Sequence, residues 1–172
     1  MEIKTIGVIG AGQMGNGIAH VAAVADYKVK LVDVNADALD KAVAVTKKNL
    51  DRQVNKEIIS QADADAALAN ISTSTEMSIL SDADLVIEAA TENEAVKKSI
   101  FDKVCAVVPE HTILASNTSS ISITRLAAAT DRPGRFIGMH FMNPVPVMKL
   151  VEVIRGRSEE HTSELQSRET IS

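Results

Sequence analysis

A histidine and a glutamate lie on either side of a proline-rich turn. His140 ends one apolar run, and Glu152 lies inside the next, where a charged side chain needs a partner. If the two runs pair as an antiparallel arm centred on Pro146, positions 140 and 152 lie opposite each other. A carboxylate beside an imidazole fixes its tautomer and stabilises the imidazolium, as a histidine general base requires. The spacing predicts a proton-transferring pair, with a structural buried ion pair as the alternative.

A glycine-rich loop near the amino terminus could bind phosphate. Gly10, Gly12 and Gly15 have G-x-G-x-x-G spacing where a strand-like run changes to a helical pattern. In such a loop the first glycine permits a tight turn, the second lets backbone N–H groups reach a pyrophosphate, and the third lets helix and strand pack closely. A purely structural glycine turn is the alternative. The predicted cofactor-binding loop comprises Gly10, Ala11, Gly12, Gln13, Met14 and Gly15.

Asp33 ends the second predicted strand, about 20 residues after this loop. A carboxylate there can accept hydrogen bonds from both ribose hydroxyls and repel a 2′-phosphate, so we expect NAD rather than NADP. A surface aspartate that caps the next helix is the alternative.

Alternating elements must position these groups. The predicted strands are residues 6–9, 29–32, 71, 85–87, 112–115, 136–141 and 149–154. The predicted helices are residues 18–25, a long helix capped by Asn35 and reaching Val54, and residues 64–68, 94–108 and 123–129. This alternation predicts an α/β fold of the Rossmann type, with a doubly wound, mostly parallel sheet. Because no linker precedes Gly156, we expect residues 1–156 to form one domain.

Composition narrows the class of protein. The chain has 172 residues, 45% of them hydrophobic, and a formal net charge of −5 without a Lys/Arg-dense block, which argues against a nucleic-acid partner. No apolar run approaches the roughly 20 residues of a membrane span, and the amino terminus enters a strand pattern directly, so we expect a cytoplasmic protein. Cys105 is the only cysteine. We expect it to be a buried, inert thiol, and we expect no metal site.

Residues 157–172 differ from the rest of the chain. This stretch, RSEEHTSELQSRETIS, contains only two large apolar residues, Leu165 and Ile171. Its amino-acid sequence resembles the translation of a short-read sequencing adapter, as if the adapter were coding sequence. We therefore expect a non-native tail that is disordered or weakly helical, and we exclude His161 from any site.

Four blocks in order resemble the NAD domain of 3-hydroxyacyl-CoA dehydrogenases, closest to those of the 3-hydroxybutyryl-CoA type. They are GVIGAGQMGNGIA, DLVIEAATEN, SNTSSISIT and GMHFMNPVPVMKLVEVI. The resemblance implies that His140 is the catalytic base, that Glu152 orients it, and that Ser119 bonds the 3-oxygen of the substrate. It also implies that the family's helical C-terminal domain, which completes the substrate site and supplies the dimer contact, is missing from this sequence.

The same resemblance implies further contacts. Near the ribose and nicotinamide it implies Glu92, Lys97, Asn117, Ser119 and Asn143. For coenzyme A it implies Arg52 and Lys56, again with Ser119. From the residues alone, Lys97 could instead be a solvated helix cation, and Arg52 and Lys56 part of a solvated helix face.

The implied reaction is the reversible, NAD-dependent oxidation of an L-3-hydroxyacyl-CoA to a 3-oxoacyl-CoA. The family's full-length members are expected to be homodimers or higher homo-oligomers. Two alternatives stay open: a truncated fragment that only binds NAD, and a relative that acts on another hydroxy acid.

Overall fold

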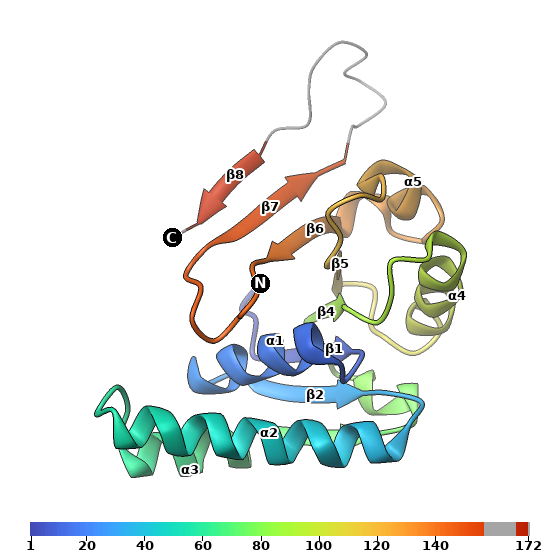
Figure 1. Cartoon of the computed structure of the whole chain (residues 1–172). Helices are drawn as coiled ribbons and strands as arrows, with labels where there is room; N and C mark the ends of the chain where they lie inside the picture. The colour runs from blue at the N-terminus through green and yellow to red at the C-terminus, as the bar shows by residue number, and fades with distance from the viewer. Residues whose placement is uncertain (157–167, 172) are drawn as a thin grey trace.

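The computed structural model describes residues 1–156 and 168–171. Its centre is an eight-stranded sheet with the order β3-β2-β1-β4-β5-β6-β7-β8 (Figure 1). The strands are β1 (Thr5–Ile9), β2 (Lys28–Val32), β3 (Ile71–Ser74), β4 (Leu85–Glu88), β5 (Ile113–Ser116), β6 (Phe136–Phe141), β7 (Val151–Arg155) and β8 (Arg168–Ile171). Strands β1 to β6 pair in parallel, whereas β7 and β8 are antiparallel to their neighbours. The predicted doubly wound, mostly parallel sheet is confirmed.

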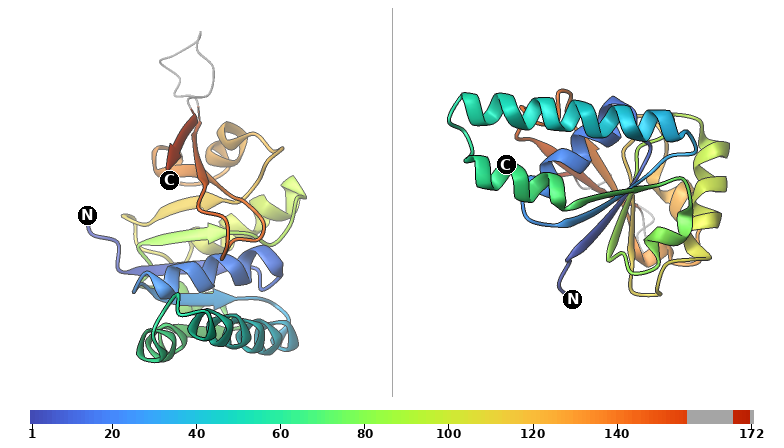
Figure 2. Two further views of the ribbon diagram at one scale, coloured as in Figure 1. Left: turned by 60° about the vertical axis from the view of Figure 1, so that its left-hand side comes forward. Right: turned by 90° about the horizontal axis from the view of Figure 1, so that it is seen from below.

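Helices cover both faces of the sheet (Figure 2). They are α1 (Gln13–Val24), α2 (Ala36–Asn55), α3 (Gln61–Ala69), α4 (Glu94–Cys105) and α5 (Ile123–Ala128), with short 3-10 helices η1 (Met77–Leu80) and η2 (Pro133–Arg135). Helices α1, α2 and α3 contact one another on one face, and α4 contacts α5 and η1 on the other.

The central strands are buried on both faces, which explains their continuous apolar runs. Adjacent side chains in a strand point to opposite faces, so neighbours enter different clusters. Val8 packs in the cluster that includes Ile18 and Leu39 of α1 and α2, whereas Ile9 packs with Phe101 of α4. Each helix layer therefore has its own hydrophobic core, and the sheet separates the two.

Local signals account for most helix ends. The side chain of Asn35 accepts hydrogen bonds from the N–H groups of Asp37 and Ala38, which confirms the predicted cap of α2. Helix α4 ends at Cys105 rather than at residue 108, because the N–H groups of the next residues close back onto the Val104 carbonyl before Pro109. The 3-10 helices η1 and η2 were not predicted.

The tail differs in part from expectation. Residues 157–167 and 172, which include His161 and Leu165, lie outside the described residues. Residues Arg168–Ile171 form β8 along β7, so the prediction of disorder or weak helix is wrong for this stretch. Without a neighbour, β7 would present unpaired backbone groups along that edge, and an extended segment can pair with them. The non-native origin of residues 157–172 stays a prediction, as does the domain boundary at residue 156.

None of the helices within residues 1–156 and 168–171 has both the length and the apolar content of a membrane span. Over the same residues, no three His, Cys, Asp or Glu side chains gather as they would around a metal ion.

Candidate cofactor clefts and proton-transfer pair

The glycine loop joins β1 to α1, and its glycines occupy different surroundings. Gly10 has a positive φ of 103°, and a Cβ atom there would lie 2.8 Å from the carbonyl oxygen of Ala89. A Cβ atom at Gly15 would lie 1.7 Å from the carbonyl oxygen of Gly10. At Gly12, by contrast, nothing lies within 4 Å of a Cβ position. The loop therefore has an open position at the N-terminus of α1, a geometry that fits a bound pyrophosphate.

Asp33 follows β2 and faces this loop. One carboxylate oxygen accepts the Ala11 N–H at 2.8 Å, and the other accepts the Asn35 N–H at 2.9 Å. The helix cap itself is the Asn35 side chain, so the alternative in which Asp33 caps α2 is wrong. Asp33 is half-buried and lines both of the cavities described next.

Two cavities meet at Gly10, Asp33 and Ala90. The first, which we call the α1–α2 cleft, has a volume of about 710 Å³ and is lined by the glycine loop, α1, α2 and residues 143–146. The second, the α4 cleft, has a volume of about 800 Å³ and is lined by residues that follow β2 and β4, by η1 and by α4. Its walls include the apolar side chains Val34, Met77, Val96 and Ile100, which sequence analysis did not identify as functional. An apolar slot beside a ribose-binding carboxylate can receive an adenine base.

The predicted cofactor residues divide between these cavities and the surrounding structure. The α1–α2 cleft is lined by Gly10, Ala11, Gly12, Gln13, Asp33 and Asn143. Neither of these clefts is lined by Met14, Gly15, Glu92, Lys97, Asn117 or Ser119. Gly17 of α1 packs against Val145 of the proline-rich turn, since a Cβ atom at position 17 would lie 2.8 Å from the Val145 Cβ.

His140 and Glu152 are direct partners across the antiparallel pair β6–β7, as the sequence predicted. The His140 Nδ1 atom lies 3.4 Å from the Glu152 Oε2 atom. The two side chains are 26% and 25% exposed, so a ligand can reach them. Contact at Nδ1 leaves Nε2 as the ring nitrogen that can exchange a proton.

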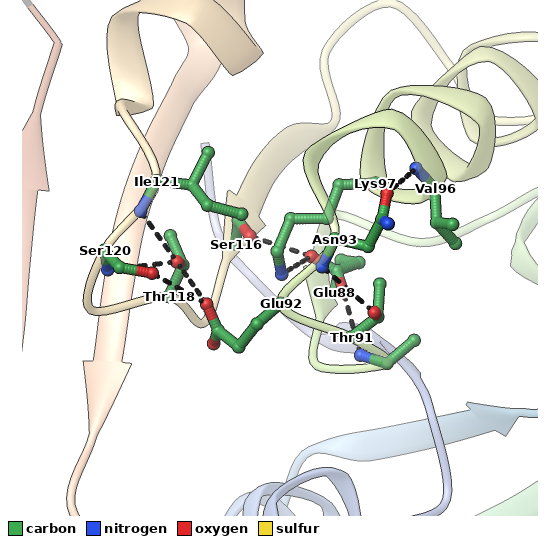
Figure 3. A network of polar contacts seen from close by, with 11 residues as sticks. Glu88, Thr91, Glu92, Asn93, Val96, Lys97, Ser116, Thr118, Ser120 and Ile121 are labelled. Carbon is green, nitrogen blue, oxygen red and sulfur yellow. Dashed lines mark hydrogen bonds and ion pairs between the residues drawn. The ribbon is translucent and has the colours of Figure 1, made fainter.

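The end of β5 and the loop after it carry several hydroxyl groups, most of which are already hydrogen-bonded (Figure 3). Ser116 donates to Glu88, Thr118 and Ser120 donate to Glu92, and Ser122 caps α5. Ser119 is exposed, and the described residues supply no hydrogen bond to its hydroxyl. Ser119 is thus the hydroxyl of this loop that remains available to a ligand.

Three residues implied near the nicotinamide also hold neighbouring segments together. The Asn117 Oδ1 atom accepts the Phe141 N–H at 3.0 Å and so joins the loop to β6 beside His140. The Glu92 carboxylate accepts the Thr118 and Ser120 hydroxyls. Lys97 is fully buried and ion-paired with Glu88 at 2.5 Å, so the alternative of a solvated helix cation is wrong.

Arg52 and Lys56 are exposed at the carboxyl end of α2 and its C-cap. They lie outside the α1–α2 cleft, whose lining includes Lys41 and Asn49. Positions 49, 52 and 56 are spaced by three and four residues, so they follow one face of the helix. Arg52 and Lys56 therefore continue the face that lines the cleft. The spacing of Asn49 from Arg52 and Lys56 along the helix could have predicted from sequence that Asn49 shares their face.

Cys105 and His111 lie away from the clefts. Cys105 is half-buried rather than fully buried, and burial raises the pKa of its thiol. His111 is exposed and lies 3.1 Å from the Asp84 carboxylate, at the amino end of β5.

The strand order, the glycine loop and Asp33 define a dinucleotide-binding α/β domain. Residues 5–170 match the family described as 3-hydroxyacyl-CoA dehydrogenase, NAD binding domain. The chain belongs to this family, and its cofactor is NAD.

Named relatives agree with this assignment. The chain is 55% identical over 169 residues to a 3-hydroxybutyryl-CoA dehydrogenase of Bradyrhizobium diazoefficiens, with 98% of this chain and 58% of the relative covered. It is 52% identical over 156 residues to a probable 3-hydroxybutyryl-CoA dehydrogenase of Bacillus subtilis, with 91% and 54% covered. The crystal structure of (S)-3-hydroxybutyryl-CoA dehydrogenase from Ralstonia eutropha superposes with a TM-score of 0.88 at 54% identity, with 90% and 55% covered. The chain thus spans just over half the length of these relatives.

Proposed function

We propose that this chain is the NAD-binding half of a dehydrogenase that interconverts L-3-hydroxyacyl-CoA and 3-oxoacyl-CoA, with 3-hydroxybutyryl-CoA as the substrate type. The observation that carries the proposal is the His140–Glu152 pair, which lies in register across β6 and β7 in a domain that binds a dinucleotide. The names of the relatives support the substrate class.

The residues of the clefts suit the parts of NAD. The N–H groups of the glycine loop would hold the pyrophosphate, Asp33 the adenosine ribose, and the apolar α4 cleft the adenine. The strand ends of β4, β5 and β6 belong to the other half of the doubly wound fold, where the nicotinamide would lie. NAD supplies a hydride acceptor, and the remaining chemistry falls to side chains.

The proton transfer would fall to His140. Its Nε2 atom would take the proton of the 3-hydroxyl group as the hydride leaves C3, and Glu152 would stabilise the imidazolium. The free hydroxyl of Ser119 would donate a hydrogen bond to the same oxygen and stabilise the charge that develops there. In the reverse direction, His140 would return the proton.

The coenzyme A part of the substrate would lie along α2. The α1–α2 cleft reaches residues 143–146, which follow His140, and the cationic face of α2 runs outward from the cleft through Arg52 and Lys56. Ammonium and guanidinium groups suit the phosphates of coenzyme A. We extend the proposed substrate site to Lys41 and Asn49, because both line the cleft.

For the chain as it stands, we propose NAD binding without turnover. The chain covers 58% and 54% of two relatives, and the proton-transfer pair is about one-quarter exposed, whereas efficient catalysis needs a site that excludes water. A homodimer or higher homo-oligomer through a further domain is proposed for the longer protein. We also propose a cytoplasmic location.

Two measurements test the proposal. Titration of this chain with NADH and NADPH should show binding with a preference for NADH, and loss of binding or a preference for NADPH would refute the assignment of the loop and Asp33.

The chain should then be joined to the C-terminal half of the Bradyrhizobium relative and assayed with acetoacetyl-CoA. His140→Asn should lower kcat about 10²–10⁴-fold. His111→Asn, a change of an exposed histidine at the amino end of β5, is the matched control and should leave kcat unchanged. Equal activity of the two variants would contradict the proposed base.

A further inference from the structure

The proposed reaction does not use three fully buried polar residues, although they lie beside its site. Glu88 ends β4, Lys97 lies in the first turns of α4, and Ser116 ends β5. Their side chains meet beneath the loops that follow these strands (Figure 3). Glu88 and Lys97 are 0% exposed, and so is Ser116.

One carboxylate connects three segments of the chain. The Glu88 Oε1 atom accepts hydrogen bonds from the Lys97 Nζ at 2.5 Å and from the Ser116 Oγ at 2.8 Å. The Oε2 atom accepts the Ala90 N–H at 2.7 Å. Glu88 therefore fixes the loop after its own strand, the start of α4 and the end of β5 relative to one another.

Stability alone does not account for this arrangement. Removing two charges from water is costly, and apolar residues of similar volume often stabilise a core as well or better. A fully hydrogen-bonded buried group does, however, hold its neighbours in one geometry.

The segments that Glu88 fixes are parts of the candidate site. Ala90 lines both clefts. Ser116 precedes Asn117, whose side chain holds the Phe141 N–H next to His140. Ligands of doubly wound folds bind at the carboxyl ends of the strands, and β4 and β5 belong to the half of the sheet opposite Asp33.

We propose that Glu88 is a positioning residue for the nicotinamide half of the dinucleotide. By holding Ala90 and Ser116, with Lys97 as its buried counterion, it fixes the loops at the ends of β4 and β5 against which the nicotinamide binds. This inference rests on the proposed function of the chain. It requires that loss of the Ser116 hydrogen bond weaken binding at the nicotinamide end and leave the adenosine and pyrophosphate end, beside which Ala90 lies, unchanged.

A comparison of NADH with ADP-ribose tests this requirement, because ADP-ribose lacks only the nicotinamide ring. Ser116→Ala removes one hydrogen bond to Glu88 and leaves the ion pair intact. The matched control is Thr112→Val, because the buried Thr112 hydroxyl donates to the Ala83 carbonyl at 2.6 Å at the opposite end of β5. Both variants lose one buried hydroxyl of the same segment, so their thermal stabilities should fall by similar amounts. The charge-free variant Glu88→Gln/Lys97→Met removes the ion pair and provides a second test.

Ser116→Ala should weaken NADH binding about fivefold, the equivalent of one hydrogen bond, and leave ADP-ribose affinity within about twofold. Glu88→Gln/Lys97→Met should lose at least as much NADH affinity, with a smaller loss for ADP-ribose because Ala90 also lines the two clefts. Thr112→Val should change neither affinity. A parallel loss of both ligands, or an equal effect of Thr112→Val, would overturn the positioning role while leaving NAD binding established. No NADH binding by the unsubstituted chain would overturn the proposed function and this inference with it.

Discussion

A methyl group at Gly12 should weaken NAD binding without unfolding the chain, whereas the same group at Gly15 should disrupt the fold. Gly12 has φ −72° and ψ −171°, values that alanine adopts without strain, and nothing lies within 4 Å of its Cβ position. At Gly15 the Cβ atom would lie 1.7 Å from the backbone oxygen of Gly10, and this oxygen cannot move unless the loop moves. The two glycines of the same loop therefore separate ligand approach from packing.

The expected magnitudes differ accordingly. At Gly12, alanine is a poorer N-cap than glycine, but it also restricts the unfolded chain, and the two effects of under about 1 kcal/mol nearly cancel. Tm should then stay within about 4 °C of the parent. A methyl group between the loop and the pyrophosphate removes at least one hydrogen bond to a charged group, worth about 1.5–3 kcal/mol, or about tenfold to a hundredfold in affinity. Gly15→Ala should cost at least about 3 kcal/mol of stability, at the upper end for an overpacked site.

Thermal melts and NADH titrations of the variants check both expectations. Gly134→Ala is the control, because Gly134 also has no atom within 4 Å of its Cβ position and lies in η2 at the amino end of β6. It should change neither Tm nor affinity. NADH binding by Gly12→Ala as tight as that of the parent would refute the placement of the pyrophosphate. Unfolding of Gly12→Ala to the extent of Gly15→Ala would refute the separation of roles.

Three further outcomes are expected. Asp33→Asn should raise the affinity for NADPH relative to NADH about tenfold, since a like-charge repulsion is removed; titration with both cofactors measures the ratio. His20 lies on the buried side of α1, and burial lowers its pKa, so below the ordinary value of about 6.5 the unfolded chain binds more protons than the folded chain. The free energy of unfolding should therefore fall from pH 7 to pH 5, and His20→Leu should show a shallower fall in melts across that range. Lys97→Met should cost about 3–5 kcal/mol because it leaves a buried carboxylate unpaired, and adding Glu88→Gln should recover most of the loss in urea unfolding.

The parts of the site that lie close together in sequence could be predicted. The glycine loop has its own spacing, and the register of His140 with Glu152 follows from a turn centred on Pro146 between two apolar runs. In both cases local geometry decides the outcome. A strand places side chains with a period of two, and residues at equal distances from the centre of the connection pair with one another. The positions of β1 to β7 followed from apolar runs, whereas β8 did not.

The clefts could not be predicted, because they form between elements that are far apart in sequence. The α4 cleft brings Val34 near Ile100, and the α1–α2 cleft brings Asn49 and Lys41 near residues 143–146. The contact of the glycine at position 17 with Val145 is of the same kind, since only the folded chain places α1 beside the proline-rich turn. Spacing along one helix indicates which residues share a face. It does not indicate what that face meets.

The Glu88–Lys97 ion pair could have been predicted from sequence, although sequence analysis did not predict it. Glu88 ends the apolar strand Leu85–Glu88, where an unpaired carboxylate is costly. Lys97 is the fourth residue of α4, and a cation near a helix N-terminus is unfavourable. Each charge is unfavourable alone, but the short connection between the strand and the helix allows them to meet, and together they are compatible with burial. The sequence therefore predicts an internal ion pair when a buried strand ends in an acidic residue and the next helix has a lysine in its first turns. This pair is missed if the lysine is assumed to be solvated or to bind the cofactor.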